Sequence, residues 1–123
     1  MPTYTRDSGL TSEELSQDPE VLAAHDADTL THSLVTARWF TESRAAQAAA
    51  ISSVDCLDIP SLWLVGGADT IADVSITQAA FARAGGDKTL HVYEGLHHEV
   101  LNELDREPVL ADLESWLLDR FPG

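Results

Sequence analysis

Two stretches of the sequence carry residues suited to acid–base chemistry. Asp69 follows the apolar run Leu62–Val65 and two glycines, and the pair His97-His98 follows the alternating segment Thr89–Tyr93. Parallel strands of an open α/β sheet gather their functional groups at their carboxyl ends. A carboxylate there can accept from an imidazole N–H, fix its tautomer and stabilise its cation. The sequence therefore predicts an acid–base pair, with Asp69 as the acid and one of the two histidines as the base.

Two other interpretations of these residues are weighed against this one. A lone aspartate after a strand is commonly a turn or capping residue, and Asp73 suits that role because it precedes the helical run Val74–Ala84. A metal site built from the adjacent His97, His98 and Glu99 is disfavoured, because neighbouring side chains do not converge on one ion as helical i, i+4 pairs do. We expect no metal and no cofactor.

The elements around these residues predict an α/β arrangement. The run Leu62–Val65 is almost wholly apolar, as in a parallel strand covered on both faces, and Ile59-Pro60 is expected to start it. The helical run ends at Gly85-Gly86, and the second strand follows. A last helix is predicted to begin near Asp105–Pro108 and to place its apolar residues on one face.

Upstream of these strands the sequence predicts a polar N-terminal segment followed by helices. Residues 1–17 are interpreted as a loop, in which Thr11–Glu14 forms a capping box. Asp18-Pro19 has the N-cap and first-turn pattern of a helix that ends near Ala27. A long helix is predicted over Thr29–Ala50. The predicted segments are residues 1–17, 18–53 and 54–123.

Three motifs carry a resemblance to a known family: IPSLWLVGGADTIAD, DKTLHVYEGLHHEVLNE and DREPVLADLESWL. In this order they resemble the C-terminal part of the α/β-hydrolase fold, in particular its monoacylglycerol lipase and lysophospholipase-like branch of serine hydrolases. The resemblance covers the chain from Asp18 onward. It implies the last two parallel strands of that fold with flanking helices, preceded by helices derived from the cap. In the cap reading Trp39 and Phe40 face substrate; the alternative is that they pack a helix on the sheet.

The resemblance also assigns roles to individual residues. It implies that Asp69 and His98 are two members of a Ser-Asp-His triad, and it places His97 where relatives often carry an aromatic residue. The run H-E-x-x-N-E-x-x-R that begins at His98 is similar to one that leads into the last helix of the family. Within it Glu99, Asn102 and Arg106 are expected to hold the histidine loop through turn, cap and salt-bridge contacts.

The third member of the triad has no counterpart in these 123 residues, because no G-x-S-x-G elbow occurs among them. In this fold the chain order is nucleophile, acid, histidine, so the serine is expected upstream of Met1. The resemblance then implies a fragment of a carboxylic ester hydrolase acting on lysophospholipids, monoacylglycerols or short esters, and inactive alone. The alternative is a truncated, inactive relative that serves as a binding module. Dehalogenases and C–C bond hydrolases share the acid and base, so the unseen nucleophile leaves them open too.

Composition excludes several partners. Twenty-one acidic residues against 7 Lys plus Arg give a net charge of −14, which repels nucleic acid and anionic lipid. The acidity suits a protein of a high-salt cytoplasm, or the absent N-terminal half of the fold is less acidic. A melting curve recorded against salt concentration distinguishes these two explanations. No apolar run has the length of a membrane span, and no signal-peptide pattern precedes it, so a cytoplasmic location is expected. Cys56 is the single cysteine and suits a small apolar position.

A partner is expected for a different reason. A two-stranded parallel ribbon is not stable by itself, and its free edge exposes unpaired backbone groups. The chain is therefore predicted to bind the N-terminal half of the fold, to pair with a second copy, or to be loosely packed.

Overall fold

The computed structural model describes residues 4–122, and its central feature is a short parallel sheet. Strand β3 (Ser61–Gly66) pairs in parallel with β4 (Lys88–Tyr93), in the register Ser61 to Lys88. Helix α3 (Val74–Arg83) connects them. Both predicted strands and the predicted helix between them are confirmed, except that β3 begins at Ser61 rather than at Ile59-Pro60.

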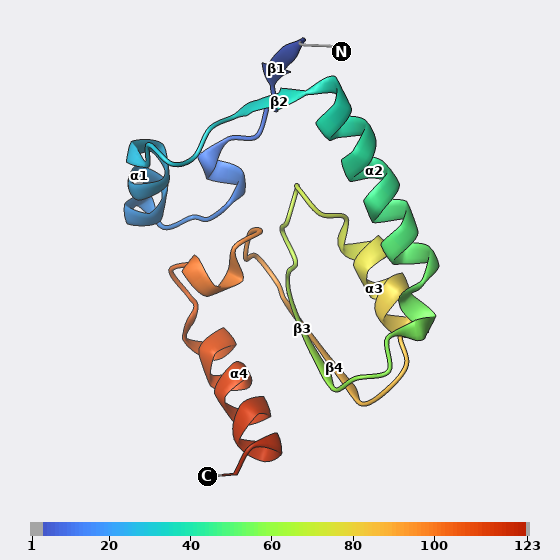
Figure 1. The fold of residues 1–123 in the computed structure, drawn as a ribbon. Helices are drawn as coiled ribbons and strands as arrows, with labels where there is room; N and C mark the ends of the chain where they lie inside the picture. Colours follow the sequence, from blue (N-terminus) through green and yellow to red (C-terminus); the bar gives the residue numbers. More distant parts are fainter. Residues whose placement is uncertain (1–3, 123) are drawn as a thin grey trace.

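Helices cover the two faces of this sheet. Figure 1 shows α2 (Ala37–Ser52) and α3 on one side of the strands and α4 (Glu107–Arg120) on the other. Trp63 packs on Val54, Ala80 and Ala84 on the first side. Leu64 packs on the opposite face, the side of α4, against the cluster Leu96, Val100 and Val109. Successive strand residues therefore face opposite layers, which explains the continuous apolar run.

Short 3₁₀ turns and caps join these elements. The turns η1 (Ser12–Glu14), η2 (Val54–Cys56) and η3 (Val100–Asn102) precede or follow the longer elements. The predicted capping box between Thr11 and Glu14 is present at η1. Helix α1 (Pro19–Ala27) has Asp18 as its N-cap, and the Asp18 side chain accepts from the backbone N–H of Glu20 at 2.9 Å. These local predictions are confirmed because capping depends on neighbouring residues alone.

The prediction of one helix over Thr29–Ala50 was wrong in its first part. Leu34–Thr36 forms strand β2, which pairs antiparallel with β1 (Thr5–Asp7), a strand inside the segment interpreted as a loop. Helix α2 begins only at Ala37, where the Thr36 hydroxyl accepts from the Trp39 N–H at 3.0 Å. The N-terminal segment supplies the pairing partner, so tertiary context overrides the helical pattern.

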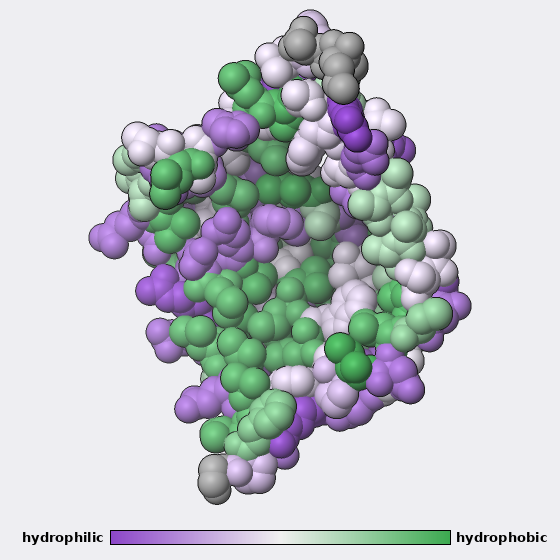
Figure 2. Space-filling model, viewed as in Figure 1, coloured by the Kyte–Doolittle hydropathy of each residue, from purple (hydrophilic) through white to green (hydrophobic). Residues whose placement is uncertain are grey.

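Much apolar surface stays exposed outside the two clusters. Trp39 and Phe40 on α2 are 53% and 55% exposed, so they do not pack this helix on the sheet. On α4, Val109 is fully buried, whereas Leu117 and Leu118 are 42% and 60% exposed. Figure 2 shows a broad apolar area on this face of the molecule. Within residues 4–122, no helix is long and apolar enough to cross a bilayer.

Candidate active site

The loop after β3 fixes the carboxylate of Asp69. One oxygen, Oδ1, accepts hydrogen bonds from the backbone N–H groups of Ile71 at 2.8 Å and Ala72 at 3.0 Å. The side chain is only 5% exposed. Both donors lie within three residues of the acid, so these two hydrogen bonds depend on neighbouring residues. The second oxygen, Oδ2, stays available for another partner.

That partner is His98. Its Nδ1 lies 2.8 Å from Oδ2 of Asp69. Burial would raise the pKa of Asp69, but the hydrogen bonds from Ala72, His98 and Ile71 outweigh burial and lower the pKa below its ordinary value. The carboxylate is therefore ionised at neutral pH and can only accept, so Nδ1 of His98 carries the proton. The structure thus brings together the acid and one of the two candidate bases.

The loops after β3 and β4 cross at very short range. A Cβ at Gly66 would collide with the backbone carbonyls of Leu96 and His97, so only glycine fits there. The N–H of Ala68 donates to the carbonyl of Leu96 at 2.9 Å, which ties the two loops together. At the start of the histidine loop, Gly95 has a φ of +87°, a conformation that favours glycine. These contacts set the separation of acid and base.

His97 points to a different partner. Its Nδ1 lies 2.9 Å from the backbone carbonyl oxygen of Glu13, and because a carbonyl only accepts, Nδ1 donates there. Its backbone N–H donates to the Glu103 carboxylate at 2.6 Å. The ring of His97 is thus used in a backbone contact, and the acid Asp69 is bonded to His98 instead.

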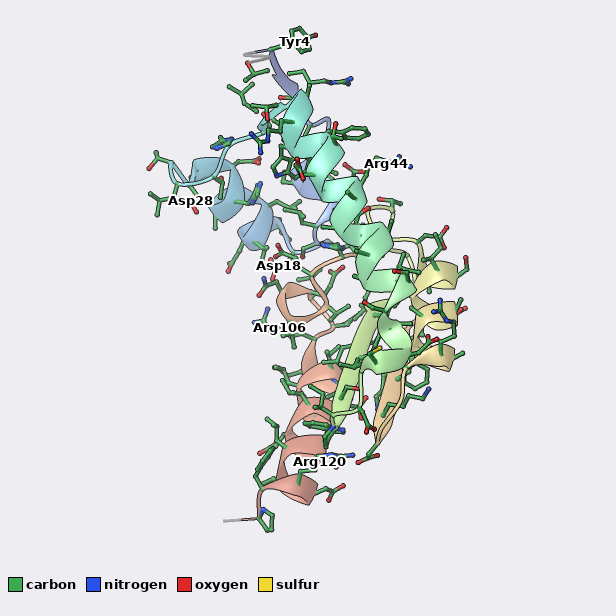
Figure 3. All side chains as sticks on the ribbon, turned by 45° about the vertical axis from the view of Figure 1, so that its right-hand side comes forward. Tyr4, Asp18, Asp28, Arg44, Arg106 and Arg120 are labelled. Atoms are coloured by element: carbon green, nitrogen blue, oxygen red, sulfur yellow. The ribbon has the colours of Figure 1, made fainter. Side chains whose placement is uncertain are left out.

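The three residues expected to hold the histidine loop lie around its far end. The Glu99 carboxylate accepts from Asn102 Nδ2 at 2.7 Å. Arg106 lies 3.6 Å from Asp18, the N-cap of α1, and Figure 3 shows the two labelled residues on neighbouring segments. Within residues 4–122, no hydrogen bond or ion pair joins the side chains of Glu99, Asn102 or Arg106 to His98. Any effect on the base would therefore pass through the loop backbone.

Two further acidic residues have well-defined partners. Asp73 accepts from the N–H groups of Ser75 and Ile76, which confirms it as the N-cap of α3. Glu103 is the residue whose importance the sequence did not reveal: its side chain is fully buried beside the histidine loop. No signal in the local sequence marks it, because its partners include residues near the other end of the chain.

An apolar groove opens beside the pair. It has a volume of about 610 Å³ and lies between α2, β3 and α3, with His98 at its border. The His98 side chain is 38% exposed. The apolar lining of the groove comes from three parts of the chain: Ala50, Ile51 and Val54; Trp63; and Ile71, Ala72, Ile76 and Ala80.

The remaining chemistry of the site is limited. Within residues 4–122, Nε2 of His98 forms no hydrogen bond with a serine, and no group of three His, Cys, Asp or Glu side chains could hold a metal ion. The arrangement can accept a proton at Nε2 while Asp69 stabilises the resulting imidazolium.

Comparison with known proteins shows the family to which the chain belongs. The family model described as "Serine aminopeptidase, S33" matches residues 1–105. The chain belongs to this family. Among curated members of related sequence, phospholipase YtpA of Bacillus subtilis is 30% identical over 110 residues, covering 88% of this chain and 42% of that protein. The monoacylglycerol lipase of Mycolicibacterium smegmatis is 34% identical over 123 residues, covering 91% and 41%.

Solved structures show the fold to which this family belongs. The monoacylglycerol lipase of Paleococcus ferrophilus superposes with a TM-score of 0.87 at 23% identity, covering 97% of this chain and 47% of that one. A monoglyceride lipase from Saccharomyces cerevisiae, solved with a substrate analogue, gives 0.79 at 21% identity, covering 96% and 44%. The fold is the C-terminal portion of an α/β hydrolase. The chain spans less than half the length of each of these relatives.

Proposed function

We propose that this chain supplies the acid and the base of a carboxylic ester hydrolase. Asp69 is the acid, His98 is the general base, and the serine nucleophile comes from polypeptide other than these 123 residues. The observation that carries the proposal is the 2.8 Å contact between His98 Nδ1 and the buried carboxylate of Asp69. Membership of the serine aminopeptidase S33 family supports it.

In the proposed reaction His98 transfers one proton in each of two half-reactions. Nε2 takes the proton of the serine hydroxyl as its oxygen attacks the ester carbonyl, and Asp69 stabilises the imidazolium that forms. The same proton then passes to the departing alcohol, leaving an acyl-serine. Water repeats the sequence: His98 accepts a proton from the water that attacks the acyl group, and returns it to the serine.

We propose lipid esters as the substrate class, with lysophospholipids, monoacylglycerols and short esters as candidates. The apolar groove beside His98 supports this, because an acyl chain leaves water on entering such a surface. The printed names of two relatives, a phospholipase and a monoacylglycerol lipase, agree with the same class.

The missing part of the fold is proposed to join at the sheet edge. Among residues 4–122, β3 pairs only with β4, so its other edge has unpaired backbone groups. We expect this edge to take the N-terminal portion of a hydrolase or a second copy of the chain. Gel filtration with hydrogen exchange tests this: a monomer whose amides at 62–65 are strongly protected would refute it.

The functional test combines this chain with a nucleophile. The N-terminal portion of the Mycolicibacterium smegmatis lipase is fused to, or mixed with, the chain, and hydrolysis of a p-nitrophenyl ester is followed. We expect activity only in combination, with kcat reduced about 10⁴-fold by His98→Ala or Asp69→Asn. Glu114→Gln, an exposed change on α4, is the control and should leave kcat unchanged. Activity that survives His98→Ala contradicts the proposal.

A second candidate is a binding module without turnover. The absence of a G-x-S-x-G elbow from the sequence favours it. On this hypothesis the chain binds an ester or a protein partner but no combination with a nucleophile-bearing portion hydrolyses the ester. Binding of a monoacylglycerol analogue, unaffected by Asp69→Asn and without turnover in the fusion, would favour this candidate over the hydrolase.

A further inference from the structure

Glu103 stands out as a charged residue in the most buried part of the molecule. Its side chain is 0% exposed, and within residues 4–122 no Lys or Arg lies within ion-pair distance of its carboxylate. It follows η3, in the same loop as His98. A buried carboxylate without a cation is unfavourable unless hydrogen bonds replace the lost water. Its position therefore needs a structural reason.

Its two oxygens accept from two distant parts of the chain. Oε1 accepts from the backbone N–H of His97 at 2.6 Å, and Oε2 accepts from the N–H of Gln17 at 2.9 Å. The Ser16 hydroxyl lies 3.5 Å from Oε2. Burial would raise the pKa of Glu103, but the hydrogen bonds from Gln17 and His97 outweigh it and lower the pKa. The carboxylate is therefore ionised and accepts at both oxygens.

The segment 13–17, which we call the brace, lies along the histidine loop. The carbonyl of Glu13 accepts from the ring of His97 at 2.9 Å, and the carbonyl of Leu15 accepts from the N–H of Glu99 at 2.8 Å. The residues immediately before and after His98 are thus both bonded to the brace. His97 lies 84 positions from Glu13, and Glu99 lies equally far from Leu15, so these contacts depend on the tertiary fold.

We propose that Glu103 is a positioning residue for the base: its carboxylate joins the brace to the backbone of His97 and thereby sets the ring of His98 on Asp69. The contacts that carry this are the 2.6 Å and 2.9 Å hydrogen bonds to His97 and Gln17. The inference rests on the proposed function only in calling His98 the base. Glu103 itself touches no reacting atom.

Glutamine is the informative replacement because it has the same shape as glutamate. Its side-chain amide has one oxygen and one NH₂ group. If the oxygen accepts from His97, the NH₂ faces the N–H of Gln17, and two donors then oppose each other. Glu103→Gln therefore loses one of the two connections while filling the same space. The brace and the histidine loop are no longer joined through residue 103.

The test measures the ring of His98 directly in the full 123-residue chain by NMR. The Nδ1 proton of His98 is assigned by its absence in His98→Asn. In Glu103→Gln we expect this proton to exchange with water about tenfold to a hundredfold faster, the effect of losing a hydrogen bond to a charged group. Amide protection in β3 should stay as in the parent chain. Glu114→Gln, which removes the same charge from an exposed site, should change neither quantity.

A second variant gives a graded result. Ser16→Ala removes the hydroxyl that donates to the Asn102 carbonyl at 2.9 Å and lies 3.5 Å from Oε2 of Glu103, while the two main contacts of Glu103 remain. The Nδ1 proton of His98 should therefore exchange at a rate between those of the parent chain and Glu103→Gln. Unchanged exchange in Glu103→Gln would overturn the proposal. Loss of β3 protection together with the Nδ1 proton would also overturn it, because Glu103 would then be a general determinant of folding.

The outcome is separable from the fate of the proposed function. If the Nδ1 proton is lost in Glu103→Gln but no fusion hydrolyses an ester, the positioning role stands and the hydrolase proposal fails. If fusions hydrolyse esters through His98 while the Nδ1 proton of His98 exchanges no faster in Glu103→Gln than in the parent chain, the hydrolase proposal stands and the positioning role fails.

Discussion

The acid loop and the histidine loop are held in place by different means. Asp69 is fixed by backbone donors two and three positions away, at Ile71 and Ala72. The loop that carries His98 is fixed by contacts with the brace, residues 13–17, and through the buried carboxylate of Glu103. The acid thus depends on its neighbours in sequence, whereas the base depends on the far end of the chain.

This difference predicts how each loop responds to change. A locally bonded turn keeps its shape as long as its own residues remain, even when the surrounding fold loosens. A loop bonded to a distant segment loses its geometry when that segment moves. The relative geometry of Asp69 and His98 is therefore more sensitive to changes in the brace than to changes around the acid.

The largest effect is expected where the two loops meet. Gly66→Ala places a methyl group against the backbone carbonyls of Leu96 and His97, and backbone atoms cannot move aside as a side chain can. We expect a loss of about 3 kcal/mol in the free energy of unfolding, measured by denaturant titration. Gly67→Ala is the comparison variant: its Cβ would lie 3.1 Å from backbone atoms of Tyr93 and Glu94, a tight contact that shifts of a few tenths of an ångström relieve, so a smaller loss is expected. Equal effects of the two changes would contradict the close crossing.

Acid should weaken both loops. The folded-state pKa values of Asp69 and Glu103 are lowered from 3.8 and 4.5, respectively. A group with a lowered folded pKa contributes stability that is fully present above its unfolded pKa and is lost as the pH falls through the folded pKa. The parent chain should therefore lose unfolding free energy as the pH falls below 4.5, and Glu103→Gln should lose less. A denaturant midpoint recorded against pH checks this, and parallel curves would contradict it.

The local nature of the acid loop predicts a smaller effect for Asp69→Asn. The amide oxygen of asparagine can still accept from Ile71 and Ala72, so the turn should persist and the unfolding free energy should change by less than about 1 kcal/mol. Asp69→Ala removes the acceptor and should destabilise the chain by about 1–2 kcal/mol. If the asparagine variant is as unstable as the alanine variant, the hydrogen bond between His98 and the Asp69 carboxylate outweighs the local turn.

The smallest effect is expected at the outer end of the histidine loop. Glu99→Gln weakens only the side-chain contact with Asn102, since the backbone N–H that donates to Leu15 remains. The unfolding free energy should change by less than about 0.5 kcal/mol. A loss of more than about 1 kcal/mol would show that the loop is held from its outer side rather than by the brace.

The sequence predicted those parts of the fold that depend on neighbouring residues. The caps at Asp18 and Asp73, the two strands and the helix between them follow from local patterns, and the structure confirms them. The pairing of β1 with β2 was missed because two short, exposed strands carry little hydrophobic pattern. Glu103 was undervalued for a related reason, since its partner Gln17 lies 86 positions away.

The most direct test of the account is the protonation pattern of the His98 ring, observed by NMR at mildly alkaline pH. We predict that the proton resides on Nδ1, hydrogen-bonded to Asp69, and that Nε2 carries none. Asp69→Asn should disturb this pattern, whereas Asp73→Asn should leave it unchanged. A proton on Nε2 in the parent chain, or an Nδ1 proton indifferent to residue 69, would contradict the acid–base pair on which the proposed hydrolysis depends.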